Sequence, residues 1–343
     1  MTDSYFCTTC TILDSDDQTI QHTIPQYKEK LDAIFSTDLL WPQKSTIKIG
    51  FLSSGEGIER NFDDIIKDYY DIIDPLQFEV SNLSVIDMIK RVVKERLQPL
   101  VNLTFMFVDD SSTADVRISF EKKGCNSVVG TQALKIIDKN KATMNFSWIN
   151  VWAILHEFGH CLGMKHEHQS SFSNIQWNKN KLYAWGKERG WSTKKVDNNV
   201  IKQLDGKNFT NSTFDPLSIM LYFFPPEFTL NNVGVRQNYR LSGKDVIWIA
   251  QTYPIDPPIE NLTENFYFNV YKIHLNDSVA ESDRLAKNYT PLENSFDWKI
   301  PVIISVVVLI FIGISIGLFI FYKNKNKKQY TLLKNKHTHY HDL

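Results

Sequence analysis

The sequence is poor in cysteine, which excludes a fold that depends on a disulfide framework. Only four of its 343 residues are cysteines, fewer than disulfide-stapled secreted domains use. Cys7 and Cys10 form a single C-x-x-C motif, without the second pair that a structural zinc knuckle needs. Cys125 and Cys161 form either one disulfide or two buried thiols. We favour the thiols, because free cysteine behaves as a small apolar residue.

An excess of charge of either sign is also missing. The formal net charge is −1, so the chain has no electrostatic reason to bind nucleic acid or an acidic substrate. The N-terminus has neither the basic region nor the apolar run that is typical of a signal peptide. Hydrophobic residues make up 43% of the chain, which is sufficient for one sizeable globular domain with appendages.

Three histidines follow the spacing H-E-x-x-H-x-x-G-x-x-H. His156 and His160 are four residues apart, so on a helix they share one face and point at one metal ion. Gly163 is expected to end this helix in a left-handed conformation and to turn the chain back, which delivers His166 as a third ligand. Three neutral imidazoles leave a fourth position for water, which is the arrangement of a catalytic zinc site.

Glu157 lies beside the first histidine and is placed to take a proton from a metal-bound water. H-E-x-x-H alone occurs by chance in ordinary helices, but the added glycine and third histidine make this match specific. Apolar residues in and before the motif predict a buried helix, namely Ile149, Val151, Trp152, Ile154, Leu155 and Phe158. Burying three histidines and a glutamate is costly unless a metal binds them.

The pattern of helices and strands in the rest of the first 257 residues predicts an α+β domain. Helical stripes cover 62–73 and 85–97, and further helices are expected at 179–189, 198–203 and 241–254, the last with Ser242 as its N-cap. Strand-like runs occupy 46–52, 103–108, 115–120 and 142–146. This order predicts a mixed sheet over the metal-binding helix, with the strand nearest the cleft able to pair with an extended peptide.

A second motif, Ser218-Ile219-Met220-Leu221-Tyr222, lies downstream of the histidines, and Glu167 follows the third one. With these residues the chain resembles the astacin family of the metzincin clan, whose patterns are H-E-x-x-H-x-x-G-x-x-H-E and S-x-M-x-Y. The stretches 156–169 and 175–178 are most similar to microbial astacin-like peptidases. The resemblance covers residues 41–254.

The resemblance implies a zinc metalloendopeptidase with the metzincin fold and a C-terminal subdomain, acting on a protein or peptide substrate. It implies these ligands for one catalytic Zn²⁺: His156, His160 and His166. Glu157 would be the general base, and Tyr222 would stabilise the oxyanion. A core aromatic is the other reading of Tyr222.

Two further roles follow from the same resemblance. Met220 would form an apolar floor under the zinc, and Glu167 would meet the new N-terminus of the mature enzyme, as in animal astacins. The cysteines typical of animal astacins are missing, so the domain would stand without those disulfides. His22 and His168 are expected to be ordinary surface residues.

Changes in composition divide the chain into five parts. These are an N-terminal extension or pro-segment at 1–40, a catalytic domain at 41–257, a stalk at 258–299, a transmembrane helix at 300–322 and a basic tail at 323–343. Residues 302–322 are almost wholly apolar, and 21 residues of helix span about 30 Å, enough to cross a bilayer. The chain is therefore predicted to be a single-pass membrane protein.

The orientation of this span has two readings. Six lysines follow it in the tail, which places the tail in the cytosol and the catalytic domain in an extracellular or lumenal position. Eight N-x-S/T sequons precede it and agree with this, at Asn82, Asn102, Asn145, Asn208, Asn211, Asn261, Asn276 and Asn288. The missing signal peptide favours insertion after synthesis, which would leave the domain in the cytosol. We favour the orientation that places the catalytic domain in an extracellular or lumenal position.

The sequence therefore predicts a membrane-anchored zinc-dependent endopeptidase that hydrolyses internal peptide bonds through zinc-activated water. The alternative is a non-catalytic membrane surface or binding protein that keeps the metal for stability. The intact Glu157 favours the enzyme, since a structural site needs no base.

Overall fold

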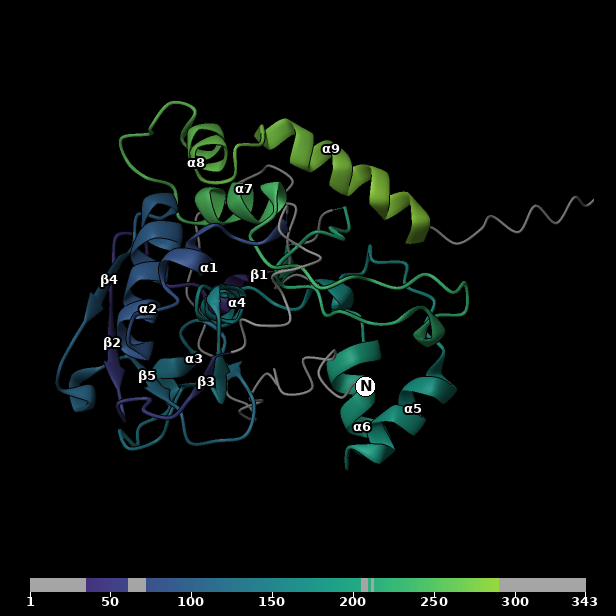
Figure 1. Cartoon of the computed structure of the whole chain (residues 1–343), viewed down its shortest axis with the longest axis horizontal. Coiled ribbons are helices and arrows are strands. Elements are labelled where there is room, and N and C mark those ends of the chain that lie inside the picture. The colour runs from purple at the N-terminus through teal and green to yellow at the C-terminus, as the bar shows by residue number, and fades with distance from the viewer. Residues whose placement is uncertain (1–34, 61–71, 205–208, 211–212, 290–343) are drawn as a thin grey trace, which may run out of the picture. The chain divides into compact units, whose positions relative to one another are not determined.

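A five-stranded mixed sheet forms one layer of the protein. The computed structural model describes residues 35–60, 72–204, 209–210 and 213–289 (Figure 1). The strand order is β4 (Thr104–Phe107), β2 (Thr46–Phe51), β5 (Val116–Ser119), β7 (Met144–Asn145) and β6 (Asn126–Ser127). The first four are parallel, and β6 runs antiparallel to β7 at one edge. The four predicted strand runs are confirmed.

Two helices pack on this sheet and build the main core. Helix α2 (Val85–Val92) continues through Val93–Leu97, as the 85–97 stripe predicts, and α4 (Val151–Cys161) carries the first two histidines (Figure 1). Their apolar side chains join those of the strands in one buried cluster, which includes Ile47, Ile49, Met88, Ile89, Ile118, Ile154, Leu155 and Phe158. The predicted 62–73 stripe falls largely outside the described residues. After it, α1 (Leu76–Glu79) begins directly behind Pro75.

Both ends of α4 are held by side chains from distant parts of the chain. At its start, Asn150 caps the helix, and the Gln77 side chain accepts the first helical N–H at 2.8 Å. At its end, the Trp41 indole N–H donates to the Cys161 carbonyl at 2.7 Å, and the Tyr253 hydroxyl donates to the Leu162 carbonyl at 2.7 Å. A buried helix must satisfy its terminal backbone groups, and these side chains do so for several groups at the two ends of α4.

A second apolar cluster defines a C-terminal subdomain, as the resemblance implies. It is built around α5 (Lys179–Glu188) and α6 (Thr193–Val196), which lie together in Figure 1, and α6 continues through Asp197–Ile201. Helix α7 (Gly243–Thr252) then returns to the main core. Ser242 caps it in a reciprocal capping box with Asp245, so the predicted N-cap is confirmed.

The predicted stalk at 258–299 is wrong over most of its length. Residues 262–286 form α8 (Leu262–Tyr271) and α9 (Leu275–Ala286), which pack beside α7 (Figure 1). Tyr267 and Tyr271 of α8 are buried in the main core. The sequence shows no strong apolar period here, because two of the three buried residues of α9 are serines.

The domain also begins before residue 41. Strand β1 (Phe35–Ser36) pairs with β9 (Phe209–Thr210), and the Ser36 N–H donates to the Gly163 carbonyl at 3.1 Å. The remaining short elements are β3 (Glu59–Arg60), which pairs with β8 (Trp148–Ile149), and α3 (Gln132–Lys135). The catalytic domain therefore extends beyond the predicted 41–257 at both ends.

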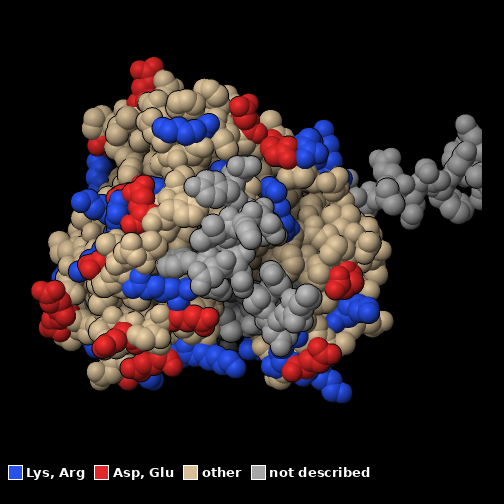
Figure 2. All heavy atoms as spheres, viewed as in Figure 1, with Lys and Arg blue, Asp and Glu red and all other residues tan. Residues whose placement is uncertain are grey.

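Cys125 and Cys161 are buried thiols that no disulfide joins, as we favoured. Burial raises the pKa of the Cys161 thiol to about 12. No described helix has both the length and the apolar character to span a bilayer. The predicted transmembrane helix at 300–322, the basic tail and the 1–34 part of the predicted extension lie outside the described residues. On the face seen in Figure 2, basic and acidic side chains of the described residues are intermixed.

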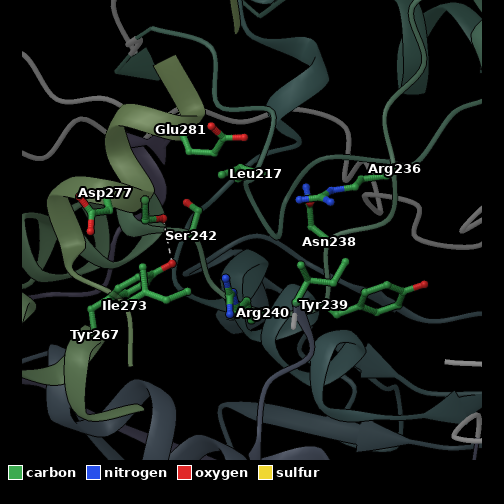
Figure 3. Close-up of a pocket in the computed structure, with 12 residues that line it drawn as sticks. Leu217, Arg236, Asn238, Tyr239, Arg240, Ser242, Tyr267, Ile273, Asp277 and Glu281 are labelled. Atoms are coloured by element: carbon green, nitrogen blue, oxygen red, sulfur yellow. Dashed lines mark hydrogen bonds between the residues drawn. The ribbon is translucent and has the colours of Figure 1, made fainter. Parts of the chain in front are cut away.

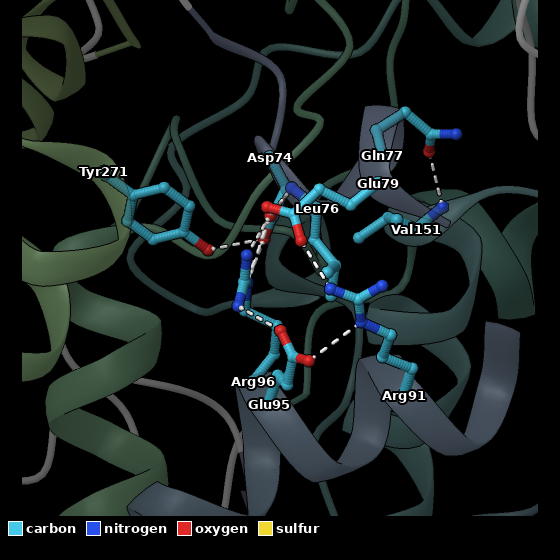
Figure 4. A network of polar contacts seen from close by, with 9 residues as sticks. All are labelled: Asp74, Leu76, Gln77, Glu79, Arg91, Glu95, Arg96, Val151 and Tyr271. Carbon is cyan, nitrogen blue, oxygen red and sulfur yellow. Dashed lines mark hydrogen bonds and ion pairs between the residues drawn. The ribbon is translucent and has the colours of Figure 1, made fainter. Parts of the chain in front are cut away.

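A buried ion pair ties α8 to the rest of the core (Figure 4). Asp74 is fully buried and accepts hydrogen bonds from the Arg96 guanidinium at 2.8–3.0 Å. The Tyr271 hydroxyl of α8 donates to the same carboxylate at 3.0 Å. Removing one partner of a buried ion pair leaves the other charge without compensation, which is strongly destabilising.

Arg96→Met is therefore expected to lower the free energy of unfolding by about 3 kcal/mol, measured by urea denaturation of the zinc-loaded protein. Arg91→Met is the matched control, because Arg91 lies in the same helical run but pairs with exposed glutamates. Arg91→Met should lower the free energy of unfolding much less, since exposed ion pairs contribute little to stability. Equal losses in the two variants would show that the buried pair has no special weight.

Candidate metal centre

The three predicted histidines meet at one point inside the protein. His156 and His160 project from α4, and His166 follows the turn at Gly163, whose φ of 102° is left-handed as predicted. One nitrogen from each ring lies within 4.8 Å of the others, and all three side chains are buried. The Nε2 atoms of His160 and His166 are 3.1 Å apart. This is the donor set of a metal site with three imidazole ligands.

Backbone carbonyls fix the orientation of the first two imidazoles. His156 Nδ1 lies 2.8 Å from the Ile219 carbonyl, and His160 Nδ1 lies 2.8 Å from the Met164 carbonyl. A carbonyl can only accept, so each Nδ1 carries the proton and each Nε2 keeps its lone pair for a metal. His156 Nε2 is buried and has no hydrogen-bond partner among the described residues. A zinc ion satisfies this atom.

The protonation state of the rings also suits a metal. Burial lowers the pKa of His156 to about 4. Burial, and then the neighbouring imidazoles, lower the pKa values of His160 and His166 well below their usual value. All three are therefore neutral at neutral pH, which is the form that binds Zn²⁺.

Met220 lies directly against the metal-binding helix, and Gly159 makes the room for it. Met220 is fully buried. A Cβ at position 159 would lie 2.5 Å from the Met220 sulfur, so any larger residue would push this side chain away. Glu157, one residue from the first ligand, is also fully buried.

The segment that carries Met220 is held by Asp245 of α7. The Ile219 N–H and the Ser218 hydroxyl each donate to this carboxylate at 2.8 Å. The same Ile219 orients His156 through its carbonyl. Asp245 therefore helps to orient a zinc ligand through Ile219, in addition to its part in the capping box with Ser242.

Tyr222 reaches the metal centre. Its ring centroid is 4.2 Å from that of His166 and 4.6 Å from that of His168, and its side chain is buried. The prediction that His168 is a surface residue is wrong. It is buried, it stacks on Tyr222, and its Nε2 lies 3.0 Å from the Asn199 carbonyl. The chain turns inward after His166, through Glu167–Gln169, and no sequence signal marks that turn.

Glu167 points into the interior. Its carboxylate accepts the Asp215 N–H at 3.0 Å, and its own N–H donates to the Met220 carbonyl at 3.1 Å. Burial, and then the nearby Asp215, raise the pKa of Glu167 well above the usual range. The pairing of Glu167 with a new N-terminus, which the resemblance implies, stays a prediction.

The sheet edge nearest the predicted cleft is β6. Within the described part of the chain, β6 pairs with β7 on one side only. It packs against α4, so its outer edge offers backbone donors and acceptors beside the metal-binding helix.

Comparisons with known proteins place these features in a family. The model of the Astacin peptidase family matches residues 84–224. A solved structure of myroilysin is 31% identical, and the match covers 65% of this chain and 99% of that chain with a TM-score of 0.52. High choriolytic enzyme 1, a hatching enzyme zinc-protease from Oryzias latipes (Medaka fish), is 17% identical over 66% of this chain and 98% of that chain, with a TM-score of 0.40. The curated proteins contain no match.

The zinc-free protein is expected to lose stability in acid. The pKa of His156 is about 4 in the fold and about 6.5 in the unfolded chain, so the unfolded state binds the proton first. Stability is then constant above about pH 6.5 and falls as the pH drops toward about 4, by about 1.4 kcal/mol per pH unit for this residue. Urea unfolding of chelated protein between about pH 8 and about pH 5 measures this slope. His156→Leu, which cannot be protonated there, should give a shallower slope, and an unchanged slope would contradict the assignment.

Proposed function

This chain belongs to the astacin family of zinc metallopeptidases, and from that premise we propose that Glu157 and Tyr222 carry out peptide-bond hydrolysis at a membrane surface. Zinc peptidase activity follows from the family and from the three converging histidines. The observation that carries the residue roles is the position of Glu157 and Tyr222 around those histidines.

Zinc supplies Lewis-acid chemistry when bound, polarising the scissile carbonyl and lowering the pKa of water to about 7. Glu157 is the general base in our proposal. It directly follows His156 on α4 and is fully buried, so the packing around it restricts the positions that its carboxylate can take. It accepts a proton from the attacking water and passes it to the amine that leaves, which balances the protons over the reaction.

Tyr222 supplies the second polar group. Its ring packs against the rings of both His166 and His168, and this packing holds the phenol at the metal centre. A phenol O–H beside the scissile carbonyl donates to the oxygen as negative charge develops there, so the hydrogen bond strengthens in the transition state. His168 supports this role by stacking on the Tyr222 ring, and it also stacks on the ring of His166.

The substrate in this proposal is an extended stretch of protein or peptide. The outer edge of β6 can form backbone hydrogen bonds with such a stretch, since edge strands pair readily with extended chains. Because these hydrogen bonds involve the substrate backbone and not its side chains, this kind of binding tolerates many substrate sequences.

Two substitutions separate the roles of base and oxyanion partner. Glu157→Ala is expected to lower kcat by about 10³-fold while zinc content stays at one ion per chain, because Glu157 is not a ligand. Tyr222→Phe is expected to lower kcat by about 10²-fold with little change in KM, since its hydroxyl acts mainly in the transition state. Peptide cleavage and metal analysis of the same preparations measure both effects.

Glu188→Ala is the control, because the Glu188 side chain is 75% exposed, on α5. It should leave cleavage and zinc content unchanged. Cleavage by Glu157→Ala at the wild-type rate would rule out the proposed base. An unchanged kcat in Tyr222→Phe would return Tyr222 to a purely structural role.

The membrane part of the proposal rests on residues 302–322 and on the lysines that follow them. An extracellular or lumenal catalytic domain would meet the glycosylation machinery. Among the described residues, four sequon asparagines are exposed and suited to it: Asn82, Asn261, Asn276 and Asn288. Asn145 is not suited, because its buried side-chain amide donates to the carbonyls of Lys122 and Gly124.

Expression in eukaryotic cells tests this orientation. We expect the protein to remain in the membrane pellet after carbonate washing and to shift in mobility when a glycosidase removes N-linked glycans. The triple variant Asn261→Gln, Asn276→Gln, Asn288→Gln should lose most of the shift, whereas Asn145→Gln should lose none. A protein with every sequon intact that shows no shift would contradict the outside orientation, and release by carbonate would contradict the anchor.

A further inference from the structure

We propose that helix α9 is a brace that positions two zinc ligands, with Ser282 and Asp283 as its positioning residues. The inference rests on the proposed function only in that it concerns the same metal centre. Helix α9 follows the segment matched by the family model, which ends at residue 224. The proposed role of α9 therefore rests only on the contacts that α9 makes in this chain.

The buried face of α9 is unusual because it is mostly polar. Three residues on one stripe are buried, Leu275, Ser278 and Ser282. A docked helix normally buries an apolar stripe. Buried hydroxyls need hydrogen-bond partners, so the two serines fix the position of α9 on its neighbours. An aliphatic face would fix that position less strictly.

Ser282 finds its partner in Asp215. The Ser282 hydroxyl donates to Asp215 Oδ1 at 2.6 Å, and the Ser242 hydroxyl donates to Oδ2 at 2.6 Å. The Leu217 N–H also donates to Oδ1, at 2.9 Å. Short hydrogen bonds to a buried carboxylate are among the stronger ones in proteins. Asp215 is thereby fixed between α7 and α9.

Asp215 passes this constraint to the third zinc ligand. Its N–H donates to the Glu167 carboxylate at 3.0 Å, and Glu167 directly follows His166. The Glu167 N–H in turn donates to the Met220 carbonyl at 3.1 Å. Ser282 is therefore linked to Glu167, the residue after His166, by two hydrogen bonds that meet at Asp215.

Asp283 provides a second route, which ends at the first zinc ligand. The Lys244 ammonium is 3% exposed and donates to Asp283 Oδ1 at 2.7 Å and to the Thr213 hydroxyl at 2.9 Å. This contact fastens α9 to the first turn of α7. The next residue of α7 is Asp245, which holds Ile219, and the Ile219 carbonyl orients His156. One helix thus reaches two of the three ligands.

A hollow beside α9 makes these polar contacts more important. Figure 3 shows Asp277 and Glu281 of α9 on one side of it and Arg236 and Tyr239 on the other. Ser242 and Tyr267 also line it. Over this stretch α9 is not packed against the 236–240 segment, so Ser282 and Asp283 are the contacts that connect it to Asp215 and Lys244.

Substituting Ser282 in the full-length, zinc-loaded protein tests the brace. Ser282→Ala is expected to release zinc to a competing chelator about tenfold faster and to lower kcat about tenfold, with KM nearly unchanged, because groups that orient metal ligands affect affinity on this scale. Asp283→Asn should change zinc release in the same direction. Its side chain is 53% exposed, so it carries the test if the alanine variant does not fold.

Ser278→Ala is the matched control. Ser278 is a buried serine one helical turn away on the same helix, but its hydroxyl contacts the Gly243 N–H at 3.0 Å and the Tyr267 hydroxyl at 2.9 Å, not Asp215. It should lower the melting temperature at least as much as Ser282→Ala while leaving zinc release near the wild-type rate. Adding Ser282→Ala to Asp215→Asn should change zinc release little further, since both act on one contact.

The outcomes separate the two proposals. Equal zinc release from Ser282→Ala and the wild type, or equal effects of Ser278→Ala and Ser282→Ala, would overturn the brace. Faster zinc release from Ser282→Ala in a protein that cleaves no peptide would support the brace and contradict the proposed function. Both measurements are made on the same preparations.

Discussion

The metal centre depends on a buried helix, α4, whose two ends are held by side chains from distant parts of the chain. Gln77 and Asn150 hold the start of α4, and Trp41 and Tyr253 hold its end. Each of these contacts removes an unsatisfied backbone group that would otherwise cost free energy in the interior. With its ends fixed, α4 has little freedom to slide or rotate, so the backbone positions of His156 and His160 are fixed as well.

Behind the histidines lies a group of buried carboxyl groups that fix the segment from Asp215 to Tyr222. Glu167, Asp215 and Asp245 are each buried and each accept backbone hydrogen bonds. Burial and the nearby Asp215 raise the pKa of Asp245 to about 7. Hydrogen bonds from backbone N–H groups and from serine hydroxyls offset part of the free-energy cost of burying these carboxyl groups. The ligand geometry is therefore set by polar groups that never touch the metal.

The sequence predicted those parts of the structure that depend on short-range spacing. The histidine positions, the left-handed Gly163, the strands of the sheet and the Ser242 cap all follow from patterns within about a dozen residues. His168, Asp215 and Asp245 were not predicted as parts of the site, because their roles come from contacts between distant segments. Asp215 meets Ser282 across 67 residues, and no local pattern encodes that distance.

The same reasoning explains why the domain end was misplaced. Helix α9 buries Ser278 and Ser282, so its sequence has the polarity of an exposed linker although its position is fixed by directional hydrogen bonds. Such contacts tolerate little displacement, whereas an apolar face can shift by fractions of an ångström at small cost.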